Sequence, residues 1–159
     1  MDKILNINGE KYNIKHLIGY GGFGKVFKAI KSNNSICCIK KPYDCQTSRR
    51  FLKREAEVLM SLNHPNIVKA FTYDDKNHLL VTEYINGQSL DYYILNKKPS
   101  DYERLKIINN LTEGLYEIHN KNITHGDLKP DNIIIDNNNI LKIIDFGSPY
   151  SSLNFAFDI

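Results

Sequence analysis

The sequence lacks the features that mark membrane, secreted and nucleic-acid-binding proteins. No apolar stretch among its 159 residues approaches the length of a membrane span, and residues 1–10 lack the apolar core of a signal peptide. The formal net charge of +3 is too small to indicate nucleic acid or a membrane surface as a partner. We therefore expect a cytoplasmic protein that binds neither nucleic acid nor membrane.

Cysteine is scarce, and its spacing argues against a zinc site. Cys37, Cys38 and Cys45 are odd in number and lack the paired C-x-x-C spacing of zinc ligands. We expect reduced thiols. The remaining composition, 42% hydrophobic and 25% charged, is that of a globular protein, and the length suits one domain with a real core.

The stretch 123–147 carries the clearest pattern. Two short runs rich in isoleucine, 133–135 and 140–144, flank the polar turn at 137–139. β-Branched runs on either side of a turn predict a β-hairpin.

Acidic and amide side chains lie at the ends of this predicted hairpin. Asp127 and Asn132 precede the first strand, and Asp145 follows the second. Oxygen ligands of this kind suit Mg²⁺. Any one of them alone would be read as a solvated residue on a surface hairpin. The full string H-x-D-L-K-x-x-N followed by D-F-G is more specific, and it resembles the catalytic and metal-binding loops of eukaryotic-type protein kinases.

A glycine-rich turn lies upstream, between predicted strands at 12–18 and 25–30. Its glycines in the pattern G-x-G-x-x-G are Gly19, Gly21 and Gly24, and Val26 follows them. Alone, such a pattern could be an ordinary flexible hairpin. A dinucleotide-binding turn would need a following helix, whereas a strand follows here. Upstream of H-G-D-L-K-P-D-N it resembles the kinase flap, in which missing side chains let backbone N–H groups approach phosphates.

A lysine ends the third predicted strand, 36–40, in the sequence C-C-I-K. A lone lysine at a strand end is usually a solvated cap. In the kinase pattern V-A-I-K, the matching Lys40 would grip the α- and β-phosphates and pair with a glutamate on the next helix. That helix is predicted over 50–62, and Glu55 lies on its inward face. Cys38 replaces the alanine that the family places above the adenine.

The segment connecting the two halves resembles the kinase hinge. Strands are predicted at 67–70 and 79–85. The resemblance makes Thr82 the gatekeeper at the back of the adenine pocket. The backbones of Glu83 and Ile85 would then bond the adenine edge.

Two helices are predicted after the hinge, at 89–95 and 101–120. Ser100 is a plausible N-cap of the longer helix, with Glu103 completing a capping box. The apolar stripe predicted for this helix consists of Leu105, Ile108, Leu111, Leu115 and Ile118.

The resemblance covers nearly the whole chain and implies an α+β, protein-kinase-like fold. Residues 1–86 would form an antiparallel sheet lobe with one helix and the hinge. Residues 87–159 would form a partial, mainly helical lobe that carries the catalytic loop and a β-hairpin. Together they would make a single, incomplete kinase domain over 1–159.

The same resemblance assigns roles around ATP and Mg²⁺. Asp127 would be the catalytic base, and Lys129 would neutralise charge on the transferred phosphoryl group. Asn132 and Asp145 would hold Mg²⁺, and Ile134 would line the nucleotide pocket. Lys129 within D-L-K-P-D-N resembles serine/threonine rather than tyrosine kinases, so we expect protein Ser/Thr hydroxyls as substrates.

Two departures from the family pattern leave alternatives open. Gly126 stands where kinases of the H-R-D type have an arginine, and no A-P-E motif follows D-F-G. We therefore expect a truncated domain whose exposed large-lobe face is covered by dimerisation or a partner chain. The alternatives are an inactive nucleotide-binding pseudokinase that acts through a partner, and a small-molecule kinase like the aminoglycoside phosphotransferases.

Overall fold

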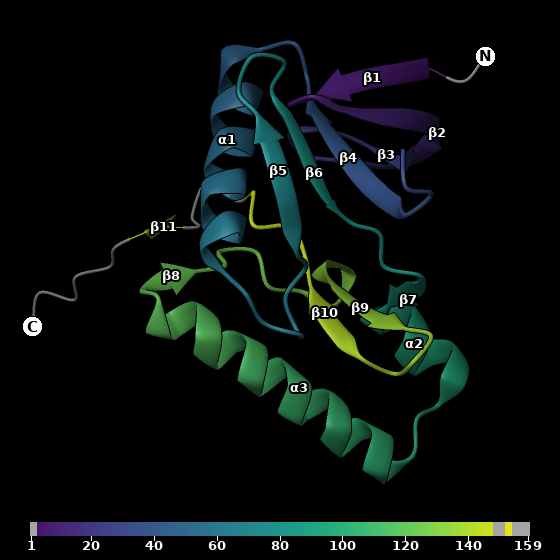
Figure 1. The fold of residues 1–159 in the computed structure, drawn as a ribbon. Helices are drawn as coiled ribbons and strands as arrows, with labels where there is room; N and C mark the ends of the chain where they lie inside the picture. Colours follow the sequence, from purple (N-terminus) through teal and green to yellow (C-terminus); the bar gives the residue numbers. More distant parts are fainter. Residues whose placement is uncertain (1–2, 148–151, 154–159) are drawn as a thin grey trace, which may run out of the picture. The chain divides into compact units, whose positions relative to one another are not determined.

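The computed structural model describes residues 3–147, 152 and 153, which belong to two compact units (Figure 1). The first unit comprises Met1–Met60 and Lys69–Tyr84, and the second comprises Ser61–Val68 and Ile85–Ile159. The first therefore ends close to the predicted lobe boundary at 86, whereas the segment between the helix and the fifth strand groups with the second unit.

The first unit is built on a six-stranded antiparallel sheet with the order β1-β2-β3-β4-β6-β5. Its strands are β1 (Lys3–Ile7), β2 (Glu10–Gly21), β3 (Gly24–Lys31), β4 (Ile36–Pro42), β5 (Ala70–Asp74) and β6 (Leu79–Glu83). The sequence analysis did not predict β1, which pairs with the first half of β2.

The prediction of a strand at 67–70 is wrong, because β5 begins only at Ala70. Ile67 instead forms an isolated parallel bridge with Ile143. Asn66 determines this pairing: its backbone oxygen accepts from Ile143 N–H, and its side chain donates to the carbonyl of Leu141. The apolar run is therefore bonded to the hairpin of the second unit.

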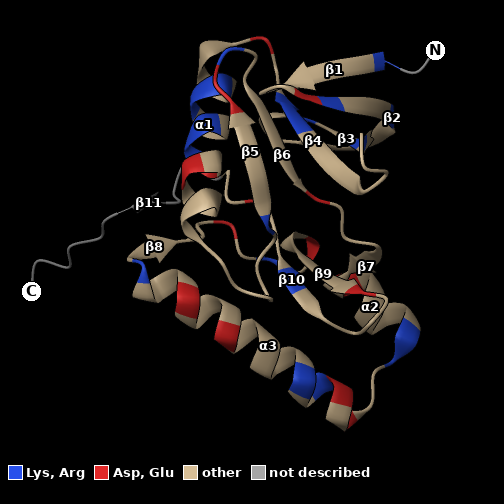
Figure 2. Cartoon of the chain, in the orientation of Figure 1, with Lys and Arg blue, Asp and Glu red and all other residues tan. Residues whose placement is uncertain are grey.

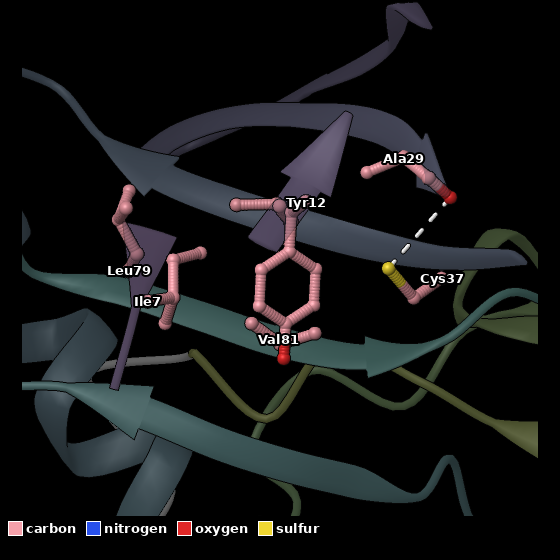
Figure 3. Close-up of a cluster of buried hydrophobic side chains, with 7 residues drawn as sticks. Ile7, Tyr12, Ala29, Cys37, Leu79 and Val81 are labelled. Carbon is pink, nitrogen blue, oxygen red and sulfur yellow. Dashed lines mark hydrogen bonds between the residues drawn. The ribbon is translucent and has the colours of Figure 1, made fainter. Parts of the chain in front are cut away.

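The core of this sheet is formed by buried side chains from β1, β2, β3, β4 and β6. The buried cluster consists of Ile7, Tyr12, Ala29, Cys37, Ile39, Leu79 and Val81 (Figure 3). Because side chains alternate along a strand, burying Cys37 and Ile39 directs Cys38 and Lys40 to the opposite face. Core packing thus sets the direction of the predicted site residues on β4.

Helix α1 (Gln46–Ser61) follows β4 and begins four residues earlier than predicted. The backbone N–H of Ser48 donates to Cys45 Sγ at 3.4 Å, so a cysteine caps the helix, a role that sequence patterns seldom assign to this residue. The buried side of α1 includes Leu52, Glu55 and Leu59. Glu55 therefore does lie on the inward face.

The described part of the second unit contains two helices, a short 3₁₀ turn and two small sheets. The elements are β7 (Gly87–Ser89), α2 (Leu90–Lys97), α3 (Asp101–Asn120), β8 (Ile123–Thr124), η1 (Pro130–Asn132), β9 (Ile133–Asp136), β10 (Leu141–Ile143) and β11 (Ser152–Leu153). The sheet orders are β10-β9-β7 and β11-β8. The hairpin predicted from the isoleucine runs is confirmed, with Ile133 opposite Ile143.

Helix α3 confirms its predicted start, and its predicted apolar stripe is buried only in part. Ser100 and Glu103 form the capping box. Leu105 and Ile108 are 61% and 56% exposed, whereas Gly114 and Ile118 are buried. A Cβ at Gly114 would lie 2.8 Å from Ile143 Cδ1, so the helix contacts β10 through a glycine. A stripe of large apolar residues cannot reveal a contact of this kind.

Among the described residues, no helix combines the length and the apolar character that crossing a bilayer requires.

Candidate active site

The catalytic loop predicted from the sequence is a compact hydrogen-bonded structure in the second unit. Asp127 Oδ2 lies 2.9 Å from Lys129 Nζ and accepts a hydrogen bond of 3.0 Å from Asn132 Nδ2. The same amide nitrogen donates to the backbone oxygen of Asp127 at 2.8 Å. The hydrogen bond to Asp127 raises the pKa of Lys129, which remains a cation. The Asp127 carboxyl group is thus held in one orientation by two side chains.

These bonds also decide which atom of Asn132 could hold a metal. Because Nδ2 donates twice to Asp127, the other amide atom, Oδ1, is the one suited to a cation. The backbone oxygen of Asn132 accepts from Ile144 N–H at 2.9 Å. Asn132 is therefore bonded to the residue directly before Asp145.

Asp145 occupies an unusual backbone conformation. Its φ is +61°, in the left-handed region that aspartate tolerates better than most side chains. Such conformations cluster at functional sites. An Asn132 amide oxygen and an Asp145 carboxylate are hard oxygen donors, and Mg²⁺ binds through one or two protein ligands together with phosphate and water. The residues present therefore fit Mg²⁺.

His125 joins the two loops, a role that the sequence analysis did not assign to it. Its Nδ1 accepts from Asp127 N–H at 3.3 Å, so the proton of the neutral ring is on Nε2. Nε2 donates to the carbonyl of Ile144 at 2.9 Å, and the ring lies 4.5 Å from that of buried Phe146. The position two residues before Asp127 is the only signal in the sequence.

The neutral state of His125 makes stability depend on pH. Burial lowers its pKa below the value of about 6.5 for an exposed histidine, so the unfolded chain binds the proton first as the pH falls. The contribution of neutral His125 to the free energy of unfolding is complete above pH 6.5 and declines as the pH falls below this value. Protonation would also place an N–H against the Asp127 N–H.

We expect the free energy of unfolding, measured with urea, to be lower at pH 5 than at pH 7.5. In His125→Gln, which keeps a side-chain donor but cannot titrate, the part of this decrease due to His125 should disappear. Identical pH dependence in the two proteins would contradict the account.

Lys40 and Glu55 form the ion pair that the sequence predicted, within the first unit. Lys40 Nζ lies 2.6 Å from Glu55 Oε2, and the two side chains are 13% and 5% exposed. The pair connects β4 to α1. Desolvated charges of this kind are costly unless paired, so each partner requires the other.

The three pattern glycines have different surroundings. A Cβ on Gly24 would lie 2.3 Å from the backbone oxygen of Lys41, whereas a Cβ on Gly19 would meet nothing within 4 Å. Gly21 is intermediate, with Lys40 Cε 3.9 Å away. Gly24 is thus required by the close approach of β3 and β4, and Gly19 and Gly21 leave space beside the turn.

This difference predicts separable effects of alanine substitution. Gly24→Ala should destabilise the protein by about 1–3 kcal/mol, because the backbone of β4 must shift to admit the methyl group. Gly19→Ala is the matched control, with an expected stability change within about 0.5 kcal/mol. Denaturant unfolding measures both. Equal destabilisation by the two substitutions would refute the structural role of Gly24.

The side chains that are expected to surround the adenine lie at paired positions on neighbouring strands. Val26 pairs with Lys40 between β3 and β4, and Cys38 pairs with Thr82 between β4 and β6. Burial raises the pKa of Cys38 to about 12. The thiol therefore stays protonated and behaves as a small apolar group.

Of the predicted hinge residues, Glu83 already makes hydrogen bonds within the protein. The N–H of Glu83 donates to Lys69 O at 2.9 Å, and its carbonyl accepts from the hydroxyl of Thr82 at 3.2 Å. Ile85 follows β6 and is half-buried. Ile134 lies in β9 of the second unit, half-buried and opposite Ser89 of β7.

Comparison with known proteins agrees with this geometry. The family model described as "Protein kinase domain" matches residues 12–152. A probable serine/threonine-protein kinase MRK1 homolog from Encephalitozoon cuniculi is 34% identical over 87% of this chain and 45% of its own length. The Aurora kinase of Saccharomyces cerevisiae is 31% identical over 92% of this chain and 42% of its own length.

The serine/threonine-protein kinase shk2 of Schizosaccharomyces pombe is 31% identical over 87% of this chain and 25% of its own length. The chain thus spans less than half the length of these curated relatives. The family match covers most of the chain and includes every residue assigned above. This chain belongs to the protein kinase domain family.

Proposed function

We propose that the chain binds Mg·ATP and transfers the γ-phosphoryl group to serine or threonine hydroxyls of proteins. The observation that carries the proposal is the bonded cluster of Asp127, Lys129 and Asn132, which is joined through Ile144 to Asp145. Family membership and the serine/threonine kinases among the relatives support the substrate class.

The roles in the second unit follow from charge and position. Asp127 would orient the attacking hydroxyl and accept its proton on a carboxylate oxygen. Lys129, 2.9 Å from Asp127, would place a positive charge near the transferred phosphoryl group. Asn132 Oδ1 and the Asp145 carboxylate would hold Mg²⁺, which neutralises phosphate charge when bound.

The first unit would supply the phosphate contacts. Lys40 would bind the α- and β-phosphates, and Glu55 would hold the ammonium group in position. The open space beside Gly19 and Gly21 would let the backbone of the turn approach the phosphates. Cys38 and Thr82, with a small side chain each, would leave room for the base.

Isothermal titration with Mg·ATP and with metal-free ATP tests the metal assignment. Asp145→Asn removes the charge and still tolerates the left-handed backbone, so it separates metal binding from backbone strain. We expect affinity for Mg·ATP to fall about tenfold or more, since a charge-assisted ligand is lost, while metal-free ATP binding changes little. Asp131→Asn, which removes an exposed acid next to Asn132 in η1, is the matched control. Unchanged Mg·ATP affinity in Asp145→Asn would remove Asp145 from the metal site.

A further inference from the structure

The tip of the glycine-rich turn is hydrogen-bonded to the loop that follows β4. The hydroxyl of Tyr43 donates to the backbone oxygen of Gly21 at 3.1 Å. The backbone N–H of the same tyrosine donates to the backbone oxygen of Phe23 at 3.0 Å. One residue thus holds the carbonyls on both sides of Gly22. Because glycine has more backbone freedom than any other residue, these bonds restrict the segment that would otherwise vary most.

A ring contact joins the same turn to α1. The rings of Phe23 and Phe51 lie 4.4 Å apart between centroids, with their planes inclined by 38°, and both residues are half-buried. Tilted aromatic pairs at this separation are favourable beyond the area that they bury. Phe51 lies four residues before Glu55, so both side chains project from the same side of the helix. The turn therefore contacts the helix that carries the partner of Lys40.

The loop after β4 is bonded in turn to the start of α1. The backbone oxygen of Tyr43 accepts from the N–H of Cys45 at 2.7 Å. Cys45 then accepts twice from the helix, with Sγ from the N–H of Ser48 at 3.4 Å and with its carbonyl from the N–H of Arg49 at 3.2 Å. Two routes thus connect the glycine-rich turn to α1, one through Tyr43 and one through the pair of phenylalanine rings.

The start of α1 has little electrostatic stabilisation of its own. Its first turn contains no acidic residue. Figure 2 shows Lys and Arg on the half of the helix that includes this turn. Positive side chains near the positive end of a helix dipole are unfavourable. The position of this end of the helix therefore depends on neighbouring contacts, including those of Cys45 and Phe51.

The bond from Tyr43 also determines the direction of a backbone donor. Gly21 contributes the carbonyl and Gly22 the N–H of one trans peptide, in which the two groups point in opposite directions. A carbonyl held by Tyr43 therefore fixes the direction of the Gly22 N–H. A Cβ on Gly22 would meet nothing within 4 Å, so there is space beside this residue. A donor whose direction is already fixed loses less conformational entropy when it binds an anion.

We propose that Tyr43 and Phe51 are positioning residues that hold the glycine-rich turn in the conformation that binds the phosphates of ATP. They act through the carbonyls of Gly21 and Phe23 and through the Phe23 ring, without touching the nucleotide. The inference rests on the proposed function, since it concerns the same phosphate contacts. The sequence analysis assigned no role to either residue, because both lie outside the motifs that it used.

Calorimetric titration with Mg·ATP and with adenosine tests the positioning role, because adenosine lacks the phosphates. Tyr43→Phe removes only a hydroxyl group, and Phe51→Leu removes the ring but keeps an apolar side chain that favours helix. The variant that combines both substitutions should bind Mg·ATP about tenfold or more weakly, since a hydrogen bond and a ring contact are lost. Tyr43→Phe alone should weaken Mg·ATP binding by about two- to tenfold. The affinity for adenosine should not change in either variant.

Matched controls make the same chemical changes elsewhere. Tyr102→Phe alters an exposed tyrosine of α3, and Phe71→Leu alters an exposed phenylalanine of β5. Both should bind the two ligands as the unmodified chain does. Equal weakening of Mg·ATP and adenosine binding in the combined variant would overturn the proposal, because it would indicate a general loosening of the pocket. Weakening of Mg·ATP binding by the controls to the same extent would overturn it as well.

Hydrogen exchange without nucleotide separates this inference from the proposed function. Exchange over 19–24 should be faster in the variant Tyr43→Phe/Phe51→Leu than in the unmodified chain, while exchange over 133–143 should be the same in both. Unchanged exchange over 19–24 would show that the two residues do not hold the turn, whatever the protein binds. Failure of the unmodified chain to bind Mg·ATP would instead contradict the proposed function, and with it the part of the inference that concerns phosphates.

Discussion

Lys40→Met is expected to destabilise the protein by about 3–5 kcal/mol, as measured by denaturant unfolding. The substitution removes the cation that lies 2.6 Å from the Glu55 carboxylate, which is only 5% exposed. Removing one partner of a buried pair leaves a desolvated charge without its counter-ion. Because whole domains are stable by only about 5–15 kcal/mol, this loss would be a large share of the total.

A second variant separates the structural role of the pair from its proposed role in ATP binding. Lys40→Met/Glu55→Leu replaces both charges by apolar groups, which is often neutral or stabilising at buried sites. We expect the double variant to recover most of the lost stability but to bind Mg·ATP as weakly as Lys40→Met. Recovery of both properties would mean that Lys40 serves only to neutralise Glu55. A loss of less than about 1 kcal/mol in Lys40→Met would show that the pair is in effect a surface pair.

Local patterns in the sequence were sufficient for much of this structure. The isoleucine runs around 137–139 predict the hairpin, and Ser100 with Glu103 predicts the start of α3. The Lys40–Glu55 pair was predictable from the resemblance to the V-A-I-K pattern, together with the inward helical face of Glu55. For the hairpin and the capping box, the deciding information lies within a few residues along the chain.

The features that the sequence did not predict depend on long-range contacts. Strand β1 is found only where β2 offers it an edge, and its short sequence carries little signal alone. The contact between α3 and β10 could not be read from the apolar stripe of the helix, because Gly114 makes the close approach. The run at 67–70 was misread because Asn66 bonds to the hairpin strand β10, some 75 residues away in the chain.

The candidate site also combines features that the sequence predicted with features that it did not predict. Motif spacing brought Asp127, Lys129 and Asn132 forward as one group, and the structure joins them by hydrogen bonds. Motif spacing could not reveal that Gly24 is required by strand packing, because a glycine pattern does not distinguish space for a ligand from space for a neighbouring strand. Nor could it reveal the two bonds of His125, which depend on the ring tautomer.

We propose that phosphotransfer depends on Asp127, and γ-phosphate transfer from Mg·ATP to a mixture of serine and threonine peptides tests this dependence most directly. Asp127→Asn keeps the size of the side chain but removes the proton acceptor, so the rate should fall about 10²–10⁴-fold. Asp131→Asn should retain the original rate. Because Gly126 replaces the arginine that would pair with a phosphorylated loop, prior phosphatase treatment should leave activity unchanged. Absence of transfer by the unmodified chain, or equal rates with Asp127→Asn, would contradict the account.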